Sequence, residues 1–492
     1  MSRLGLVFTL ALAMLFACAG VVLAQSQSPD DGQATEGEEF VEDISGLEAG
    51  DPIPGKYIVV LEDRVADPAS VADDLSADLD LETTNVYDDA LEGFAAEVPS
   101  GELRELRSDS RVKSVVQDRV VEAAQKSAAR VKRIDRSQRS IRSIVQNNRS
   151  TKKAPKKQSR KQKPSQEKPV GIKRIDADVS TAKAGDGKGK VNADIAVLDS
   201  GIYKKHKDLN VAGGVNCLGK KRMAWHDGYG HGTHVAGTAA ARDNKIGVVG
   251  VVPGARLWAV KVLDSDGLGS VSSVTCGVDW VTARAGTIEV ANMSLVSDPG
   301  TGSDDGDCGN TIEDPLHRAI CNSVEAGVLY TVAAGNENVD FTAPDTRTIP
   351  AAYDEVLTVT AVSDFNGRPG GGASRTCRHD RDDTAANFSN FTTAGGPDQG
   401  HTIAAPGVCI RSTWNNGKYD VISGTSMASS HVAGTAALCI ANGPCSAGDP
   451  EGTKETLLSD ADAQPKRYGF AGDPNDPIGT RYYGYLTYAG GY

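Results

Sequence analysis

The chain has 492 residues, of which 39% are hydrophobic and 24% are charged. This composition is typical of a globular protein long enough for one large domain and smaller units. No repeat of about 20 to 50 residues recurs, which excludes a solenoid. The net charge of −13 is the sum of three regions that differ in charge. Residues 1–125 carry 8 basic and 26 acidic side chains (−18), 126–168 carry 16 and 2 (+14), and 169–492 carry 28 and 37 (−9).

The first 24 residues are typical of a secretory signal peptide. Arg3 precedes an apolar run that ends at Ala24, before the polar Gln25, so a small residue stands at the cleavage site. A short membrane anchor is one alternative, and lipidation of Cys18 is another. No later apolar run is long enough to span a bilayer. The prediction is a secreted, extracellular protein that has no membrane partner once the signal is removed.

Residues 25–50 are acidic and rich in Gly, Ser and Glu, which predicts a disordered segment. Residues 51–122 show two βαβ-like halves, compatible with a small α+β domain that has a ferredoxin-like sheet. The predicted elements are a strand at 57–61, a helix at 68–81, a strand at 94–98, and a helix end followed by the last strand at 112–121. The basic residues 123–168 contain hardly a hydrophobic cluster, which predicts an exposed linker; polyanion binding is the alternative.

From residue 169 to 492, apolar runs alternate with helical segments that are punctuated by glycine. This pattern is typical of a doubly wound α/β domain with a mostly parallel sheet. Buried strands are predicted at 195–198, 257–262, 290–295, 328–334 and 356–362. Helices are predicted between them, among others at 231–241 and 271–285.

Eight of the nine cysteines follow the signal peptide, and all eight lie in the last 276 residues. An even number of cysteines in an exported domain predicts up to four disulfides. Two pairs would close short local loops, and we predict these pairings: Cys308 with Cys321, and Cys439 with Cys445. The alternative is that some of the eight remain free, buried thiols.

Three polar residues stand where an α/β fold presents functional groups. Asp199 ends a predicted buried strand, and His231 begins a predicted helix. Ser426 stands at a helix N-terminus, where unpaired amides favour developing negative charge. Two of them have alternatives: His231 and His234 could bind a metal, and Ser426 could be an ordinary N-cap. A single Asp at the end of a strand is weak evidence by itself. Together, however, the three supply the orienter, base and nucleophile that acyl transfer requires.

Five strings in this region resemble the subtilisin family: DSG from residue 199, HGTHVAG from 231, AVKVLDSDGLGS from 259, AAGN from 333 and GTSMA from 424. The resemblance runs from about Ile172 to near the C-terminus, and it implies a subtilisin-like fold and a serine endopeptidase. Ser426 would be the nucleophile, His231 the general base, and Asp199 the residue that orients the imidazole. Asn336 and the Ser426 amide would form the oxyanion hole. No cofactor is implied for catalysis.

The resemblance also implies that protein and peptide substrates bind as an added strand, with broad specificity because main chain pairs with main chain. The substrate-binding residues implied are Gly267, Leu268, Gly269, Ser294, Leu295, Val296, Ala334 and Gly335. The family usually has Gly at the position of Val296, so this branched side chain is expected to narrow the pocket for the residue before the cut. Ser430 replaces a common Pro, and only a local effect is expected there.

A structural Ca²⁺ site is implied in the same way. Asp208, in the string HKDL, and the loop 242–248 resemble a tight family site made of two side chains and three carbonyls. Such oxygen-only ligands suit Ca²⁺. The ligands implied are Asp208, Arg242, Asn244, Ile246 and Val248. The alternative is a solvated loop in which Lys245 points outward.

Residues 55–61, 91–95 and 112–116 resemble the inhibitory propeptide, of the inhibitor I9 type, that accompanies these proteases over about residues 51–122. The resemblance implies an intramolecular inhibitor and folding aid that is released by self-cleavage near Gln125–Lys126. Trimming of the linker would then give a mature start around residues 163–172.

The partners expected are protein and peptide substrates and the chain's own propeptide, with no nucleic acid, and the protein is expected to be a monomer. Two rival functions are a catalytically inactive fold used for binding, and a processing protease specific for dibasic sites.

Overall fold

The structure, a computed structural model, describes Ile44 and residues 46–124, 166–297 and 305–492. The predicted signal peptide with Cys18, most of the predicted acidic segment and nearly all of the basic linker lie outside these residues. Ile44 and residues 46–50 belong to the segment that was expected to be disordered. Ile44 is instead buried in a small apolar cluster with Ile53 and Val120, so ordered structure begins before residue 51.

The small α+β unit (46–124) contains an antiparallel sheet with the strand order β4-β1-β3-β2. This order, with one helix after β1 and another after β3, is the predicted ferredoxin-like arrangement. Its elements are β1 Pro52–Leu61, α1 Pro68–Leu79, β2 Glu82–Tyr87, β3 Gly93–Glu97, α2 Leu103–Leu106 and β4 Val112–Ala123. Helix α1 begins where the carboxylate of Asp67 accepts the Ser70 amide at 3.0 Å, a normal N-cap.

Two expectations for this unit are wrong. The chain from Val112 onward contains no helix end, because all of Val112–Ala123 is strand β4. Strand β2 was not predicted at all. In the sequence ETTNVY of β2 only the fourth and sixth residues are buried, so the apolar alternation is too weak to signal a strand.

The α/β unit (166–297 and 305–492) is built on a sheet with the order β13-β12-β11-β9-β5-β7-β6, with β15 also paired to β12. Every pair is parallel except β12 with β13, which confirms the predicted doubly wound sheet. The strands are β5 Asp194–Asp199, β6 Val211–Asn216, β7 Arg256–Lys261, β9 Val290–Met293, β11 Leu329–Ala333, β12 Leu357–Ser363, β13 Thr384–Ala385 and β15 Thr402–Pro406.

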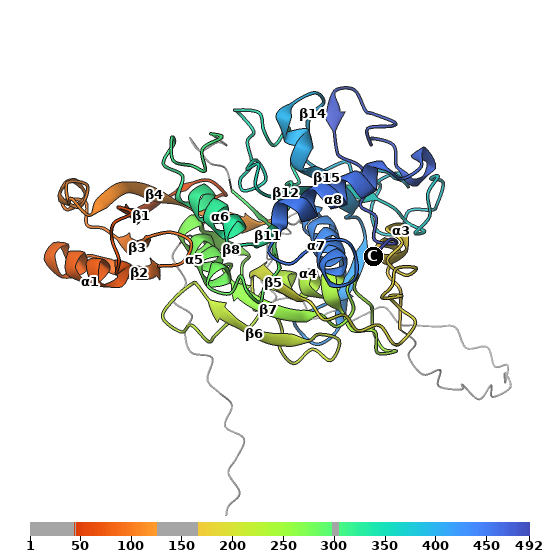
Figure 1. Cartoon of the computed structure of the whole chain (residues 1–492), viewed down its shortest axis with the longest axis horizontal. Helices are drawn as coiled ribbons and strands as arrows, with labels where there is room; N and C mark the ends of the chain where they lie inside the picture. Colours follow the sequence, from red (N-terminus) through yellow and green to blue (C-terminus); the bar gives the residue numbers. More distant parts are fainter. Residues whose placement is uncertain (1–43, 45, 125–165, 298–304) are drawn as a thin grey trace, which may run out of the picture. The chain divides into compact units, whose positions relative to one another are not determined.

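Helices cover both faces of this sheet (Figure 1). Successive side chains of a strand point to opposite faces. Accordingly Ile195 and Val197 of β5 join the core made with α4 and α7, whereas Ala196 and Leu198 join the core made with α5 and α6. The helices are α3 Val170–Arg174, α4 His231–Ala240, α5 Val271–Thr282, α6 Pro315–Glu325, α7 Thr425–Asn442 and α8 Pro450–Asp462, with the short 3-10 helices η1 Pro397–His401 and η2 Lys466–Tyr468.

Shorter strands complete the fold. β14 pairs with β18, and β16 pairs with β17, in two-stranded sheets. β8 and β10 both pair with β4 of the small α+β unit. Their bounds are β8 Leu268–Ser270, β10 Leu295–Val296, β14 Thr392–Thr393, β16 Ile410–Thr413, β17 Tyr419–Ile422 and β18 Arg481–Tyr482.

All eight cysteines of the α/β unit are paired, so the alternative of free buried thiols is wrong. The predicted disulfides Cys308–Cys321 and Cys439–Cys445 are confirmed. Two further disulfides, Cys217–Cys276 and Cys377–Cys409, join positions 59 and 32 residues apart. Each restricts the unfolded chain and so favours the folded state.

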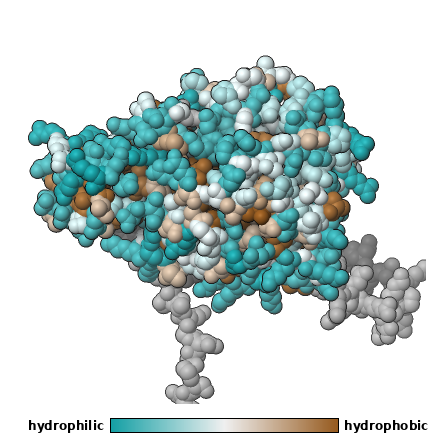
Figure 2. All heavy atoms as spheres, in the orientation of Figure 1, coloured by the Kyte–Doolittle hydropathy of each residue, from teal (hydrophilic) through white to brown (hydrophobic). Residues whose placement is uncertain are grey.

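Hydrophilic side chains cover most of the face seen in Figure 2, where apolar residues form separated patches. Patches of this kind are normal on a protein surface. Within the described part of the chain, no helix combines the length and apolarity that crossing a bilayer requires.

Two fully buried histidines make the stability of the fold depend on pH. His234 of α4 has Nε2 at 3.0 Å from the Ile410 carbonyl oxygen, and His431 of α7 has Nδ1 at 2.7 Å from that of Met427. Burial lowers the pKa of His234 to about 3 and that of His431 to about 4. In the unfolded chain both would titrate near pH 6.5. The unfolded state therefore binds more protons below that pH, and stability is lost as the pH falls.

We predict that the free energy of unfolding decreases between pH 7.5 and pH 5, by about 2 kcal/mol for each of these histidines. Urea unfolding at the two pH values would measure this decrease, with the Ser426→Ala variant used to avoid self-digestion. Adding His431→Gln should reduce the difference between the two pH values. An equal pH dependence with and without His431 would contradict the prediction.

Candidate active site

The large sheet changes winding direction at β5, and this is where the first polar residue of the site lies. From β5 the chain passes to β6 and β7 on one side, and then to β9, β11 and β12 on the other. Functional groups of open α/β sheets gather at the carboxyl ends of strands beside such a switch point. Asp199 is the last residue of β5 and is completely buried. Its Oδ1 accepts the Ser200 amide at 2.7 Å.

His231 is the first residue of α4, and it meets Asp199. Its Nδ1 lies 2.8 Å from Oδ2 and 2.9 Å from Oδ1 of that carboxylate. The close approach needs Gly232, because a Cβ there would clash with the Gly201 carbonyl oxygen. Nε2 of His231 is buried and has no hydrogen-bond partner among the described residues. With Nδ1 held by a carboxylate, Nε2 is the nitrogen available to exchange a proton.

The structure does not support a metal bound by His231 and His234. His231 points Nδ1 at Asp199, whereas His234 points Nε2 at the carbonyl oxygen of Ile410. The groups of His, Cys, Asp and Glu that lie close enough to share a metal, within the described ranges, include neither histidine. His234 is therefore a buried core histidine whose Nε2 is bound to the protein backbone.

Ser426 is the second residue of α7, and Gly424 is the N-cap. The N-cap alternative for Ser426 is therefore wrong, and its hydroxyl is not used to cap the helix. Instead this hydroxyl donates a hydrogen bond to the Ala124 carbonyl oxygen and lies 3.4 Å from that of Ser294. The amide of Ser426 is among the first four of the helix, which have no partner inside it.

Asn336 lies beside the start of the same helix. Its carboxamide oxygen accepts the Thr425 amide at 2.9 Å and the Thr425 hydroxyl at 3.2 Å. The carboxamide is thereby fixed next to Ser426. Ala334 and Gly335, which precede Asn336 and were predicted to bind substrate, are also held by hydrogen bonds. Gly335 donates its amide to the Thr425 hydroxyl at 3.1 Å, and the Ala334 carbonyl accepts the Asn390 side chain at 3.0 Å.

The position predicted for a bound substrate is occupied by the end of β4. On one side β4 pairs antiparallel with β8, which contains Leu268 and Gly269, and Ala123 donates its amide to the Gly267 carbonyl at 2.9 Å. On the other side it pairs with β10, which consists of Leu295 and Val296. Ala124 donates its amide to the Ser294 carbonyl at 2.9 Å. The small α+β unit thus adds a strand at the site, the known β-addition mode of peptide binding.

The predicted calcium residues converge in one loop. Asp208 accepts the Asn244 side chain at 2.7 Å and the Val248 amide at 3.1 Å. A Cβ at Gly247, where φ is +57°, would clash with the Asp208 carboxylate. One polar group that the sequence did not reveal also enters this loop. The side-chain amide of Gln166 donates to the carbonyls of Arg242 and Val248 at 2.6 and 2.9 Å.

The small α+β unit also docks on α5. The amides of residues 88, 89 and 90 donate to one oxygen of Asp279, at distances of 3.0, 2.7 and 2.9 Å. Burial raises the pKa of this carboxyl, and the three amides oppose that effect because they stabilise its charge. Sequence reasoning missed Asp279, since an acidic residue on a helix is ordinary until its partners are known.

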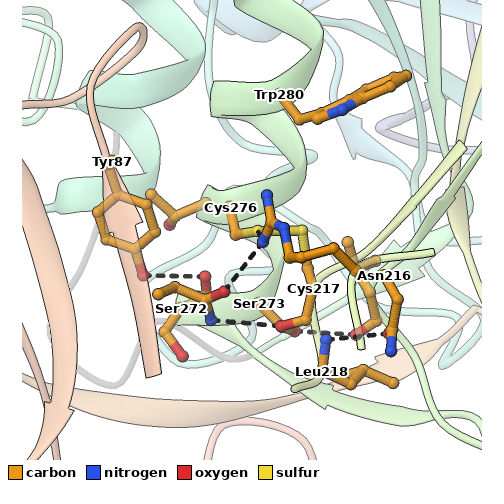
Figure 3. Close-up of a disulfide and its surroundings, with 12 residues drawn as sticks. Tyr87, Asn216, Cys217, Leu218, Ser272, Ser273, Cys276 and Trp280 are labelled. Atoms are coloured by element: carbon orange, nitrogen blue, oxygen red, sulfur yellow. Dashed lines mark hydrogen bonds between the residues drawn. A yellow bond between two sulfur atoms is a disulfide. The ribbon is translucent and has the colours of Figure 1, made fainter. Parts of the chain in front are cut away.

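A disulfide lies under the same surface (Figure 3). The Tyr87 hydroxyl of β2 donates to the Ser272 carbonyl of α5 at 3.0 Å, and the Asn85 side chain donates to the Cys217 carbonyl at 3.2 Å. Cys217 is joined to Cys276 of α5. The disulfide therefore holds together two of the segments that contact β2.

The site combines a buried carboxylate–imidazole pair, Asp199 with His231 of α4, and a serine at the N-terminus of α7, the helix that packs against α4. On a doubly wound sheet, these groups are typical of the serine-hydrolase class of site. The sequence comparisons name the family within that class. A family model described as the subtilase family matches residues 191–485, and one described as peptidase inhibitor I9 matches residues 56–124. The chain belongs to the subtilase family, the peptidase S8 family, and its N-terminal part is an inhibitor I9 domain.

Several relatives are subtilisins. Subtilisin E of Bacillus subtilis (strain 168) is 38% identical over 278 residues, which cover 56% of this chain and 62% of the relative. The subtilisin of Bacillus pumilus is 37% identical over 278 residues, which cover 56% of this chain and 86% of that one. A thermostable alkaline protease of Halalkalibacterium halodurans is 40% identical over 274 residues, covering 56% of this chain and 63% of the relative.

A solved structure described as a cold adapted subtilisin-like serine proteinase has 26% sequence identity and a TM-score of 0.44. The match covers 65% of this chain and 97% of that one.

We predict that Asp279→Ala loosens the contact between α5 and residues 88–90. Three amides lose their acceptor, so their hydrogen exchange should accelerate about tenfold or more. Exchange measured by mass spectrometry on the full chain would test this, with Glu325→Ala, an exposed acidic residue at the end of α6, as the matched control. Equal exchange in both variants would show that Asp279 does not anchor the small α+β unit.

Proposed function

We propose that this protein is a secreted serine endopeptidase of the subtilisin type, made as a precursor that inhibits and processes itself. The single observation that carries the proposal is the contact between the Ser426 hydroxyl and the Ala124 carbonyl group. A peptide carbonyl thus lies against the hydroxyl of α7, and the helix packed against α7, α4, begins with the buried imidazole of His231 that is paired with Asp199. The four disulfides support export, because disulfides persist in oxidising compartments.

In this proposal Ser426 attacks the carbonyl carbon of a bound peptide, and His231 accepts the hydroxyl proton on Nε2. His231 then gives this proton to the leaving amine. Asp199 holds Nδ1 and stabilises the imidazolium that forms in between. The negative charge that develops on the carbonyl oxygen would be stabilised by the Ser426 amide at the start of α7 and by the carboxamide of Asn336.

The small α+β unit would act as the intramolecular inhibitor. Its strand β4 lies between β8 and β10, where a substrate strand is expected to bind. It therefore denies the site to other chains as long as it stays docked. Binding through main-chain hydrogen bonds also supports activity on many protein substrates, since every peptide offers the same amides and carbonyls.

We also propose that Ca²⁺ stabilises the loop 242–248. The donors available there are oxygens, which suit this ion. They are the Asp208 carboxylate, the Asn244 side chain and the backbone carbonyls of Arg242, Ile246 and Val248. The carbonyls of Arg242 and Val248 both reach the same Gln166 nitrogen, so they already converge on one point. Lys245 is exposed and does not enter this group. Bound there, the ion would hold α4 to the segment that begins at Gln166.

We predict that Ser426→Ala abolishes peptidase activity while the chain still folds. In subtilisin, loss of the serine or the histidine lowers kcat by about 10⁶. Hydrolysis of casein and labelling by a serine-reactive phosphonate would both be measured. Ser430→Ala is the matched control. Its hydroxyl lies one turn further along α7 and donates hydrogen bonds to the backbone carbonyls of Ser426 and Met427. A wild-type chain that is neither active nor labelled would indicate an inactive, binding protein.

We predict that removing calcium with EGTA lowers the melting temperature by several degrees, because a ligand that binds only the folded state stabilises it. Restoring Ca²⁺ should reverse the shift, and Mg²⁺ should not, since it prefers a smaller octahedral site. Asp208→Asn in the Ser426→Ala background should abolish the response. An equal melting temperature with and without EGTA would favour a solvated loop without the ion.

A further inference from the structure

We infer that this site cleaves after small side chains, alanine above all, because Val296 closes the pocket for the residue before the cut, and that the precursor first cuts itself between Ala124 and Gln125. The inference rests on the proposed function and specifies its substrate. It is carried by the register of β4 in the site and by the packing around Ala124.

The register of β4 identifies the reacting carbonyl. Ala123 and Ala124 are held from opposite sides, through the carbonyls of Gly267 and Ser294. The next group along the chain, the carbonyl of Ala124, accepts the hydrogen bond of the Ser426 hydroxyl. The peptide bond that follows this carbonyl joins Ala124 to Gln125. The cut therefore falls one bond before Gln125–Lys126, the neighbourhood expected from the sequence.

The side chain of Ala124 is enclosed. It is 2% exposed and forms a small apolar cluster with Val296, which is 6% exposed, and Ala333. Val296 is paired with Glu122, two residues before Ala124. Side chains two residues apart point to the same face of a strand, so Val296 lies on the face that the Ala124 methyl group occupies. The Ala124 methyl group thus packs against Val296 and Ala333.

A larger side chain at the position of Ala124 would have to displace Val296 or Ala333. Ala333 ends β11, which is paired on both sides, with β9 and β12, and Val296 lies in β10, which is paired with β4. Inserting extra carbon atoms into a packed apolar site is unfavourable because neighbouring side chains must leave their preferred positions. Leucine and phenylalanine should therefore bind poorly in the geometry that brings the carbonyl to Ser426.

The self-cleavage follows ordinary acyl transfer. A bond forms between Ser426 Oγ and the Ala124 carbonyl carbon, and the bond from that carbon to the Gln125 nitrogen breaks. The hydroxyl proton passes to His231 Nε2 and then to the Gln125 nitrogen, which leaves as an amine. Water then hydrolyses the ester, which regenerates the Ser426 hydroxyl and leaves Ala124 with a carboxylate.

The first test uses peptides that differ only in the residue before the cut, which is Ala, Val, Leu or Phe. For the wild-type enzyme kcat/KM should be at least tenfold higher for Ala than for Phe. Val296→Gly should raise the Phe/Ala ratio about tenfold or more, with Val296→Ala between the two. Val421→Ala, in the exposed part of β17, is the matched control and should keep the wild-type ratio. Equal cleavage after Phe and Ala, or a ratio that ignores Val296, would overturn the inference.

The second test uses the precursor. Mass spectrometry of the first products should find a new C-terminus at Ala124. Ala124→Phe should slow this cut at least tenfold, and the double variant Ala124→Phe/Val296→Gly should recover much of the rate. A first C-terminus elsewhere, or no recovery in the double variant, would overturn the inference. Phosphonate labelling of Ser426 in each variant distinguishes this failure from failure of the proposed function, in which no variant would be labelled.

Discussion

The antiparallel pairing of β4 with β8 and β10 is the interaction on which the site depends. It joins the small α+β unit to the α/β unit through the backbone, and it sets which residue meets Ser426. Register in a strand is all or none, because a slip of one residue turns every side chain to the other face. A slip here would withdraw Ala124 from its contact with Val296 and Ala333. In the proposed function, the same pairing would govern both how the precursor is held inactive and where it is cut.

The α/β unit holds the three polar residues of the site, next to which β4 is paired, on regular elements of secondary structure. Asp199, His231 and Ser426 belong to β5, α4 and α7, and none of them lies on a long loop. All three are fully buried, so their rotamers are fixed by packing rather than by solvent. Close contact between α4 and the end of β5 requires the missing side chain of Gly232. In the proposed function, groups fixed in this way would need little rearrangement during the reaction, which would lower the free-energy cost of reaching the transition state.

Local signals in the sequence were enough to predict much of this arrangement. Buried parallel strands appear as continuous apolar runs, so β5 and its neighbours were predicted, as was the ferredoxin-like sheet. Features that depend on a distant partner were not. The disulfide between Cys217 and Cys276 spans 59 residues, and Gln166 lies at the end of a segment whose composition predicts a linker. β8 and β10 have only three and two residues, and they are strands because β4 lies between them.

The position of the Cys217–Cys276 disulfide has a consequence for how the small α+β unit is held. It lies beneath the surface that receives Asn85 and Tyr87, and thiols are kept reduced inside most cells. The covalent bond between the two segments that β2 contacts is therefore present only where these two thiols can be oxidised. In the proposed function, the redox state of the compartment would therefore influence how firmly the small α+β unit is held against α5.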